Sequence, residues 1–138
     1  TSQQTEGFIE NHTFWSSRVM ADISGLKGID GFVGACLVDS DSGLVLGKEG
    51  GKDFDLDTAA AGNTEVVRAK RKTMAALGID GGIEDILITL DDQYHLIRLL
   101  KSNQAIFLYV VLDKASGNLG MARMTTKKVE QTVDLSAL

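Results

Sequence analysis

Residues 39–52 read DSDSGLVLGKEGGK and hold two patterns that resemble ligand-binding loops. Alternating acids before a glycine occur in calcium loops, and glycines around a lysine occur in phosphate loops. A calcium loop that starts at residue 39 needs a bidentate glutamate at its twelfth position, where this sequence has Gly50. A phosphate loop would need a glycine in place of Leu46 and a hydroxyl residue in place of Asp53. The stretch is therefore predicted to be a β-hairpin turn rather than an ion or nucleotide site.

The other residues with versatile chemistry are Cys36, His12 and His95. They are far apart in the sequence and match no metal-ligand spacing. Cys36 has apolar neighbours, which predicts a thiol that fills the core rather than a nucleophile. A nucleophile pair of Cys36 and His95 on one sheet remains the enzymatic alternative. Apart from that alternative, the sequence predicts no catalytic residue, no cofactor and no metal site.

The overall composition narrows the class of protein. The chain has 138 residues and a net charge of −5. The acidic balance disfavours a nucleic-acid binder, and no apolar run is long enough for membrane insertion. Because Cys36 is the single cysteine, no internal disulfide can form, which favours a cytoplasmic location. Residues 1–11 are expected to be a mobile tail, and residues 12–138 to form one domain.

Hydrophobic periodicity predicts a helix, two strands, a long helix, three strands and a final helix. The first helix is indicated by apolar residues at helical spacing, namely Trp15, Val19, Ile23 and Leu26. The second helix begins at Asp55 or Asp57 and ends at Leu77, and the last begins near residues 116–118. The predicted strands cover residues 32–38, 44–47, 84–90, 94–100 and 104–113. This order predicts an α/β fold, a three-layer α/β/α sandwich around a five-stranded, mostly antiparallel sheet.

The predicted helices are too few to cover such a sheet. Five strands spaced about 4.8 Å apart span about 24 Å, whereas one helix about 10 Å wide covers about two strands. The first and last helices can share one face, which leaves the second helix alone on the other. Because several strands are apolar on both faces, part of the sheet should contact a second molecule. An exposed edge strand would also allow pairing across a two-fold axis, so the sequence predicts a homodimer.

The order and spacing of these pieces resemble the roadblock (dynein light chain) superfamily. The matching segments are GIDGFVGACLVDSDSGLVLG, DTAAAGNTEVVRAKRKTMAALG, EDILITLDDQYHLIRLL and FLYVVLDKASGNLGMARM. The resemblance implies a roadblock/profilin-like domain that dimerises, and bacterial relatives commonly work beside a Ras-like small GTPase. The sequence is similar to the type found alongside a sensor kinase-like protein and such a GTPase. The resemblance also implies pairing through the third strand at Ile86 and Ile88, although composition alone equally favours the second strand.

The second helix holds the residues predicted to contact a partner. At about 100° per residue, one side of this helix is apolar and the remainder is charged. The apolar side comprises Ala59, Val66, Val67, Thr73, Met74 and Leu77. The other side or its flanks hold the charged residues Glu65, Arg68, Arg71 and Lys72. These charged residues either form an ordinary solvated face or dock a partner such as a small GTPase. An arginine finger is disfavoured, because no arginine is predicted on a mobile loop.

Asn63 and Lys70 fall in the middle of the predicted apolar side. An unpaired buried amide costs about 1–3 kcal/mol, and a bare charge costs more. Three arrangements would satisfy them: Lys70 reaching water past the end of the sheet, a contact across the dimer, or a ligand or GTPase contact. The predicted dimer interface therefore combines Asn63 and Lys70 with Ile86 and Ile88.

These features together predict a non-enzymatic homodimeric regulator. The resemblance implies that it binds a Ras-like small GTPase or its signalling complex and modulates nucleotide hydrolysis or exchange. The alternative is a scaffold in a sensor-kinase-associated complex that has no effect on nucleotide turnover.

Overall fold

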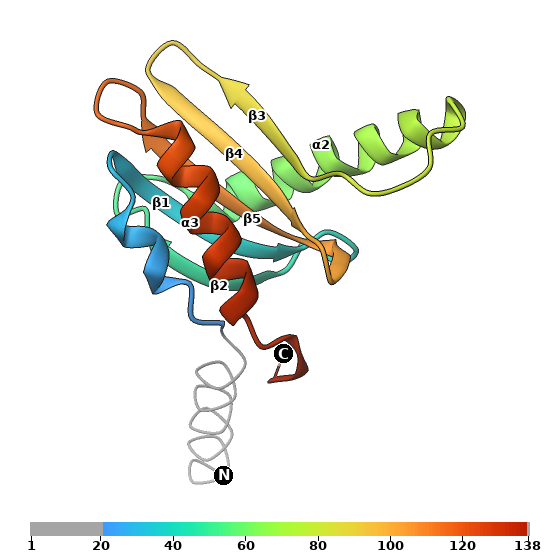
Figure 1. Cartoon of the computed structure of the whole chain (residues 1–138), viewed down its shortest axis with the longest axis horizontal. Coiled ribbons are helices and arrows are strands. Elements are labelled where there is room, and N and C mark those ends of the chain that lie inside the picture. The colour runs from blue at the N-terminus through green and yellow to red at the C-terminus, as the bar shows by residue number, and fades with distance from the viewer. Residues whose placement is uncertain (1–20, 138) are drawn as a thin grey trace, which may run out of the picture.

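The computed structural model describes residues 21–137, whose strands and helices are shown in Figure 1. In chain order they are η1 (Ser24–Gly28), β1 (Phe32–Asp39), β2 (Val45–Gly50), α2 (Leu56–Ala76), β3 (Asp85–Thr89), β4 (Gln93–Leu100), β5 (Asn103–Asp113), α3 (Leu119–Thr132) and η2 (Leu135–Ala137). The predicted tail at residues 1–11 and the predicted helical residues Trp15 and Val19 lie outside the described residues. Ile23 and Leu26 from the same prediction are buried, next to and within η1.

The five strands form one sheet in the order β2-β1-β5-β4-β3. Every neighbouring pair is antiparallel, which confirms the predicted sheet. In the middle of the sheet, Cys36 on β1 lies opposite Tyr109 on β5, which in turn lies opposite Ile97 on β4. This order places β2 and β3 at the two edges.

The sheet separates two hydrophobic cores, as strands that are apolar at nearly every position require. On one face, η1 and α3 lie over a core that includes Leu37 and Leu108. On the other face, α2 lies over a core that includes Cys36 and Phe107. Figure 1 shows α3 and η1 in front of the sheet and α2 behind it. The predicted three-layer sandwich is therefore confirmed.

Local sequence signals set the ends of the two α-helices. Asp55 Oδ1 accepts a hydrogen bond from Thr58 N at 3.0 Å, which identifies Asp55 as the N-cap of α2. The hydroxyl of Thr58 also donates to Asp55 Oδ2 at 2.6 Å, and these bonds lower the pKa of the Asp55 carboxyl. Asn118 Oδ1 accepts from Met121 N at 2.9 Å at the start of α3. Among the helices of residues 21–137, none combines the length and apolar character needed to cross a bilayer.

The acidic stretch that resembles a calcium loop forms the turn of the β1–β2 hairpin, as predicted. Gly43 N donates to Asp39 O at 2.7 Å, and Asp41 N donates to Asp39 Oδ1 at 2.9 Å. Gly43 has φ 77°, a conformation that side-chain-bearing residues rarely adopt. The carboxylate of Asp39 therefore shapes a turn. Within residues 21–137, no cluster of three His, Cys, Asp or Glu side chains is arranged to hold a metal ion.

Candidate functional site

Helix α2 covers only part of its face of the sheet. Its buried residues recur every three or four positions and form one stripe, Leu56, Ala60, Thr64 and Val67. The helix packs mainly against β1 and β2. In Figure 1 its C-terminal half projects beyond the sheet. The α2 side of β3 therefore receives little cover from the helix, as the shortage of helices predicted, whereas Ile97 and Leu99 of β4 are buried on that side.

A second stripe runs along the flank of α2, beside the covered one. It comprises Ala59, Asn63, Val66, Lys70 and Thr73, again at helical spacing. Lys70 is exposed to solvent, which is one of the arrangements expected for it, and Asn63 is half-buried. The buried stripe is centred on Thr64 and Val67, since the sheet lies against only one edge of the broad apolar side. Asn63 Nδ2 donates a hydrogen bond to Ala59 O at 2.8 Å, which uses part of the hydrogen-bonding capacity of its side-chain amide.

The flank of α2 and the region around β3 border an open hollow of about 660 Å³. Val66 and Lys70 lie on the helix side, and Ile83 and Ile86 lie on the opposite wall. A second hollow of about 440 Å³ adjoins the first at Val66 and reaches Asn63. The sheet face that α2 leaves uncovered is therefore an apolar, solvent-facing surface, as is typical of protein contact sites.

The predicted dimer residues gather around this surface. Ile86 and Lys70 line the first hollow, and Asn63 lines the second. Ile88 is half-buried and packs, like Ile86, against the core on the α2 side of the sheet. Ile83 completes the wall, although the sequence reasoning missed it. It follows two glycines in a loop, where an isolated apolar residue is the only available signal.

The hydrogen bonds between β3 and β4 fix which main-chain groups of β3 face the sheet. Just beyond one end of β3, Leu90 N donates to Gln93 O at 2.9 Å. Just before the other end, Glu84 O accepts from Leu99 N at 3.3 Å. Hydrogen-bonded positions alternate along an antiparallel pair. The residues at even positions from 84 to 90 therefore direct their N–H and C=O groups toward β4.

The residues at odd positions of β3 have the opposite orientation. The main-chain groups of Asp85, Leu87 and Thr89 point away from the sheet, and no main-chain hydrogen bond to them from outside the β3–β4 pair occurs in residues 21–137. A strand edge of this kind can pair with a strand from another molecule.

The other edge of the sheet, at β2, is partly occupied. Ala21 N donates to Leu46 O on β2 at 2.7 Å. A Cβ added at Gly47 would lie 2.7 Å from Ala21 O, so the chain passes close against this strand. Composition alone left the second strand as an equal candidate for pairing, but in the structure β3 has the freer edge.

Arg68, one of the four predicted partner-binding residues, connects α2 to the β1–β2 turn. Its Nε donates to Ser40 O at 3.0 Å, and its Nη2 donates to Asp41 O at 2.7 Å. Its Nη1 lies 3.3 Å from Glu65 Oε1, and the side chain remains 47% exposed. Most of its hydrogen-bonding capacity is therefore used within the domain.

The other predicted partner-binding residues differ in their exposure. Glu65 and Lys72 are exposed. Arg71 is half-buried, and its Nη2 is buried without a hydrogen-bond partner among the described residues. Arg71 lies at the flank of the charged side, because it follows Val67 by one helical turn and continues the covered stripe.

Of the residues considered for nucleophilic chemistry, Cys36 lies in the core and His95 is half-buried beside the second hollow. Cys36 is fully buried, and burial raises the pKa of its thiol to about 12. The ring nitrogens of His95 lie 2.9 Å from the Tyr109 hydroxyl and 2.9 Å from Gln93 Oε1. A neutral ring protonated at Nε2 satisfies both, by donating to Gln93 and accepting from Tyr109. Strand β5 lies between Cys36 and His95, so the structure does not assemble the nucleophile pair.

Comparison with known proteins relates this architecture to one fold. No protein-family model and no curated protein matches the sequence. A roadblock/LC7 domain from Streptomyces avermitilis matches with a TM-score of 0.68 and 16% identity, over 78% of this chain and 87% of that chain. MglB from Myxococcus xanthus matches with a TM-score of 0.67 and 18% identity, over 86% and 84%. A structure described as MglB with tetrameric arrangement matches with a TM-score of 0.65 and 19% identity, over 78% of each chain. The chain therefore has the roadblock fold.

Proposed function

We propose that this domain is a non-enzymatic homodimeric regulator that binds a Ras-like small GTPase, or its signalling complex, and modulates nucleotide hydrolysis or exchange. The observation that carries the proposal is the open apolar surface between α2 and β3, beside a free strand edge. The shared fold with an MglB of tetrameric arrangement supports self-association. The roadblock resemblance supplies the GTPase as the further partner, and the single buried cysteine fits a cytoplasmic location.

In the proposed dimer, β3 pairs with β3 of a second copy and extends the sheet across a two-fold axis. Ile86 and Ile88 then face the neighbouring subunit from the sheet, and Asn63 and Lys70 face it from the flank of α2. Pairing satisfies the outward main-chain groups of β3, and the second copy covers the apolar hollow. Both features point to the same occupant, which favours a second copy of this chain over an unrelated ligand.

The proposed docking surface for the GTPase comprises Glu65, Arg68, Arg71 and Lys72. Glu65 and Lys72 form its exposed part, and Arg68 contributes the outer side of its guanidinium. An arginine finger needs a guanidinium that can enter the nucleotide site. Arg68 is bound to two carbonyls, and Arg71 lies on the covered stripe. The domain would therefore act by stabilising one conformation of the GTPase rather than by donating a catalytic group.

The test uses the Ras-like GTPase whose gene lies nearest to the gene of this chain. GTP hydrolysis and release of a fluorescent nucleotide are timed with and without the full chain, and binding is measured in parallel. A change in either rate supports the regulator, and binding without a rate change supports the scaffold. Lys72→Glu should weaken binding, whereas the matched change Lys128→Glu on α3 should not. Failure of the full chain to bind this GTPase would contradict the proposal.

A further inference from the structure

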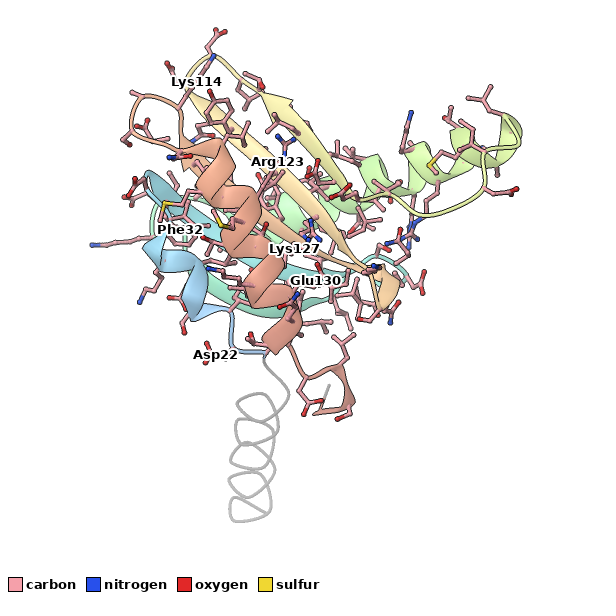
Figure 2. The ribbon with its side chains drawn as sticks, viewed as in Figure 1. Asp22, Phe32, Lys114, Arg123, Lys127 and Glu130 are labelled. Atoms are coloured by element: carbon pink, nitrogen blue, oxygen red, sulfur yellow. The ribbon has the colours of Figure 1, made fainter. Side chains whose placement is uncertain are left out.

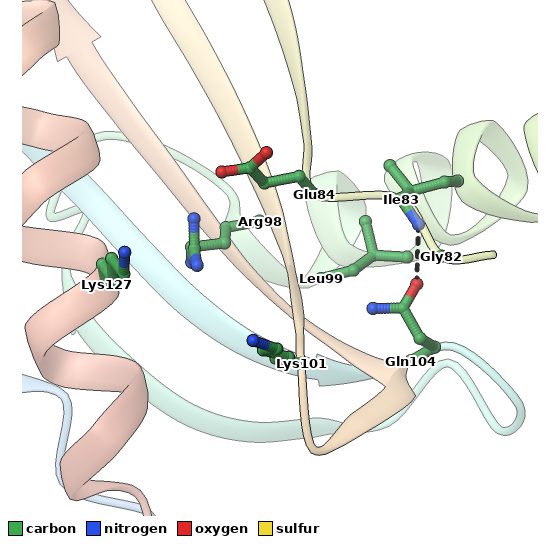
Figure 3. Close-up of a pocket in the computed structure, with 8 residues that line it drawn as sticks. All are labelled: Gly82, Ile83, Glu84, Arg98, Leu99, Lys101, Gln104 and Lys127. Carbon is green, nitrogen blue, oxygen red and sulfur yellow. Dashed lines mark hydrogen bonds between the residues drawn. The ribbon is translucent and has the colours of Figure 1, made fainter.

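Two neighbouring hollows lie at the end of the sheet where β4 turns into β5, beside α3. Their volumes are about 370 Å³ and about 490 Å³. The residues that line both hollows are Arg98, Lys101 and Lys127, and all three are basic. Figure 2 shows Lys127 on α3 between Arg123 and Glu130. Figure 3 shows the three basic side chains around one opening. Three cations from β4, the β4–β5 turn and α3 therefore converge in a chain whose net charge is −5.

Arg98 is held in position by the protein itself. It is only 8% exposed, and its Nε donates to Glu130 Oε1 at 2.6 Å. The second carboxylate oxygen of Glu130 accepts from Lys101 N at 2.7 Å, so both oxygens are used. The terminal nitrogens of the Arg98 guanidinium have no hydrogen bond to another described residue. The site thus presents pre-oriented donors that lack an acceptor within the domain.

The two lysines add charge that the domain does not neutralise. Lys101 and Lys127 are exposed, and neither ammonium forms a salt bridge within the part of the chain that the structure describes. Arg123, one turn before Lys127, is bound to Asp85 at 3.1 Å and does not line either hollow. The acids at the site are Glu130 and Glu84. The three cations therefore leave one positive charge in excess.

We propose that these hollows bind a small phosphate-bearing molecule, whose phosphoryl group lies among Arg98, Lys101 and Lys127. A phosphoryl group carries almost two negative charges and three acceptor oxygens, which suits donors that approach from three elements better than a carboxylate does. The organic part of the ligand lies in the first hollow, against Ile83 and Leu99. The volume of this hollow, about 370 Å³, lies in the range of small-molecule sites.

The test titrates phenyl phosphate into the full chain at constant ionic strength and follows amide chemical shifts by NMR. Saturable shifts are expected at residues 82–84, 98–101 and 127. Lys127→Gln should weaken the affinity about tenfold, because it removes one charge-assisted contact. Lys128→Gln makes the same charge change one residue away, at an exposed lysine that lines neither hollow. It should change the affinity by less than about twofold, since surface charges at a distance are screened by salt.

Three outcomes would overturn the proposal. The first is a non-saturating response spread over exposed lysines. The second is an equal loss of affinity in Lys127→Gln and Lys128→Gln. The third is succinate binding as tight as phenyl phosphate, which would remove the preference for a phosphoryl group. The first hollow shares Ile83 with the surface proposed for the dimer, whereas Arg98, Lys101 and Lys127 lie outside that surface. The comparison of Lys127→Gln with Lys128→Gln therefore tests the phosphate site separately from dimer formation and GTPase binding.

Discussion

Thr89→Pro is the sharpest test of pairing through β3. Thr89 is exposed, and its N–H points away from β4. Proline has no N–H, so the substitution removes one outward donor. The β3–β4 hydrogen bonds are made from the even positions and stay intact. Edge strands tolerate proline where the missing N–H would face outward, so the subunit itself should remain folded.

The expected effect follows from the two-fold symmetry. When two antiparallel β3 strands pair about Leu87, at the centre of the strand, Thr89 of one copy lies opposite Asp85 of the other. The Thr89 N–H then donates to the Asp85 carbonyl, and symmetry repeats this bond. Each lost bond weakens the dimer by about 0.5–1.5 kcal/mol, which gives about 1–3 kcal/mol for the pair. This corresponds to a dissociation constant about 5- to 150-fold higher.

Sedimentation equilibrium over a series of protein concentrations measures this change. Thr89→Ala is the matched control, because it removes the side chain and keeps the N–H. The wild-type chain and Thr89→Ala should dissociate at similar concentrations, and Thr89→Pro at higher ones. Circular dichroism checks that each variant retains its fold. Equal dissociation constants for Thr89→Pro and Thr89→Ala would refute pairing through this edge, and a wild-type monomer at micromolar concentration would refute the dimer altogether.

Three further predictions concern single residues. Arg68→Ala should lower the free energy of unfolding by about 1.5 kcal/mol and the melting temperature by about 5 °C, because two charge-assisted hydrogen bonds from a half-exposed side chain are lost. Equal melting temperatures for Arg68→Ala and Lys72→Ala would contradict this prediction. Burial lowers the pKa of His95 from its ordinary value of 6.5. As the pH decreases, His95 therefore takes up a proton in the unfolded chain before it does so in the folded protein. The free energy of unfolding should fall as the pH decreases from 6.5 to the pKa of His95 in the folded protein. Urea denaturation at several pH values should show a smaller fall for His95→Gln, and an unchanged fall would place the pH dependence elsewhere. The Cys36 thiol should resist a mild thiol reagent at about pH 8 until the protein unfolds, because burial raises its pKa to about 12; rapid labelling of the native protein, followed by absorbance, would show that this thiol is accessible.

Local patterns in the sequence are enough to predict the elements and their order. The N-cap at Asp55, the glycine turn at Gly43 and the apolar run of β5 depend on neighbours within a few residues, so each could be identified from local pattern. The placement of Cys36 in the core follows from its apolar strand. The shortage of helices was also predictable, because it depends only on the number of elements and their widths.

The use of the faces of α2 depends on how the helix packs against the sheet. Hydrophobic periodicity shows that one side of a helix is apolar, but it does not show which edge of that side the sheet covers. The sheet covers the stripe of Thr64 and Val67 and leaves the flank of Val66 and Lys70 open. The same limit applies to Arg71, because periodicity places it at a flank but does not show that the covered stripe continues to it.

The remaining features arise from contacts between residues far apart in the chain. Arg68 binds carbonyls of the β1–β2 turn, and Ala21 covers part of the β2 edge. Arg98 meets Glu130 only because α3 packs over the end of β4. Such pairs leave no local pattern in the sequence, since the distance between them is set by how the layers pack. The sequence thus specified the parts of this domain, and the packing of those parts decided which of its surfaces stay free to bind.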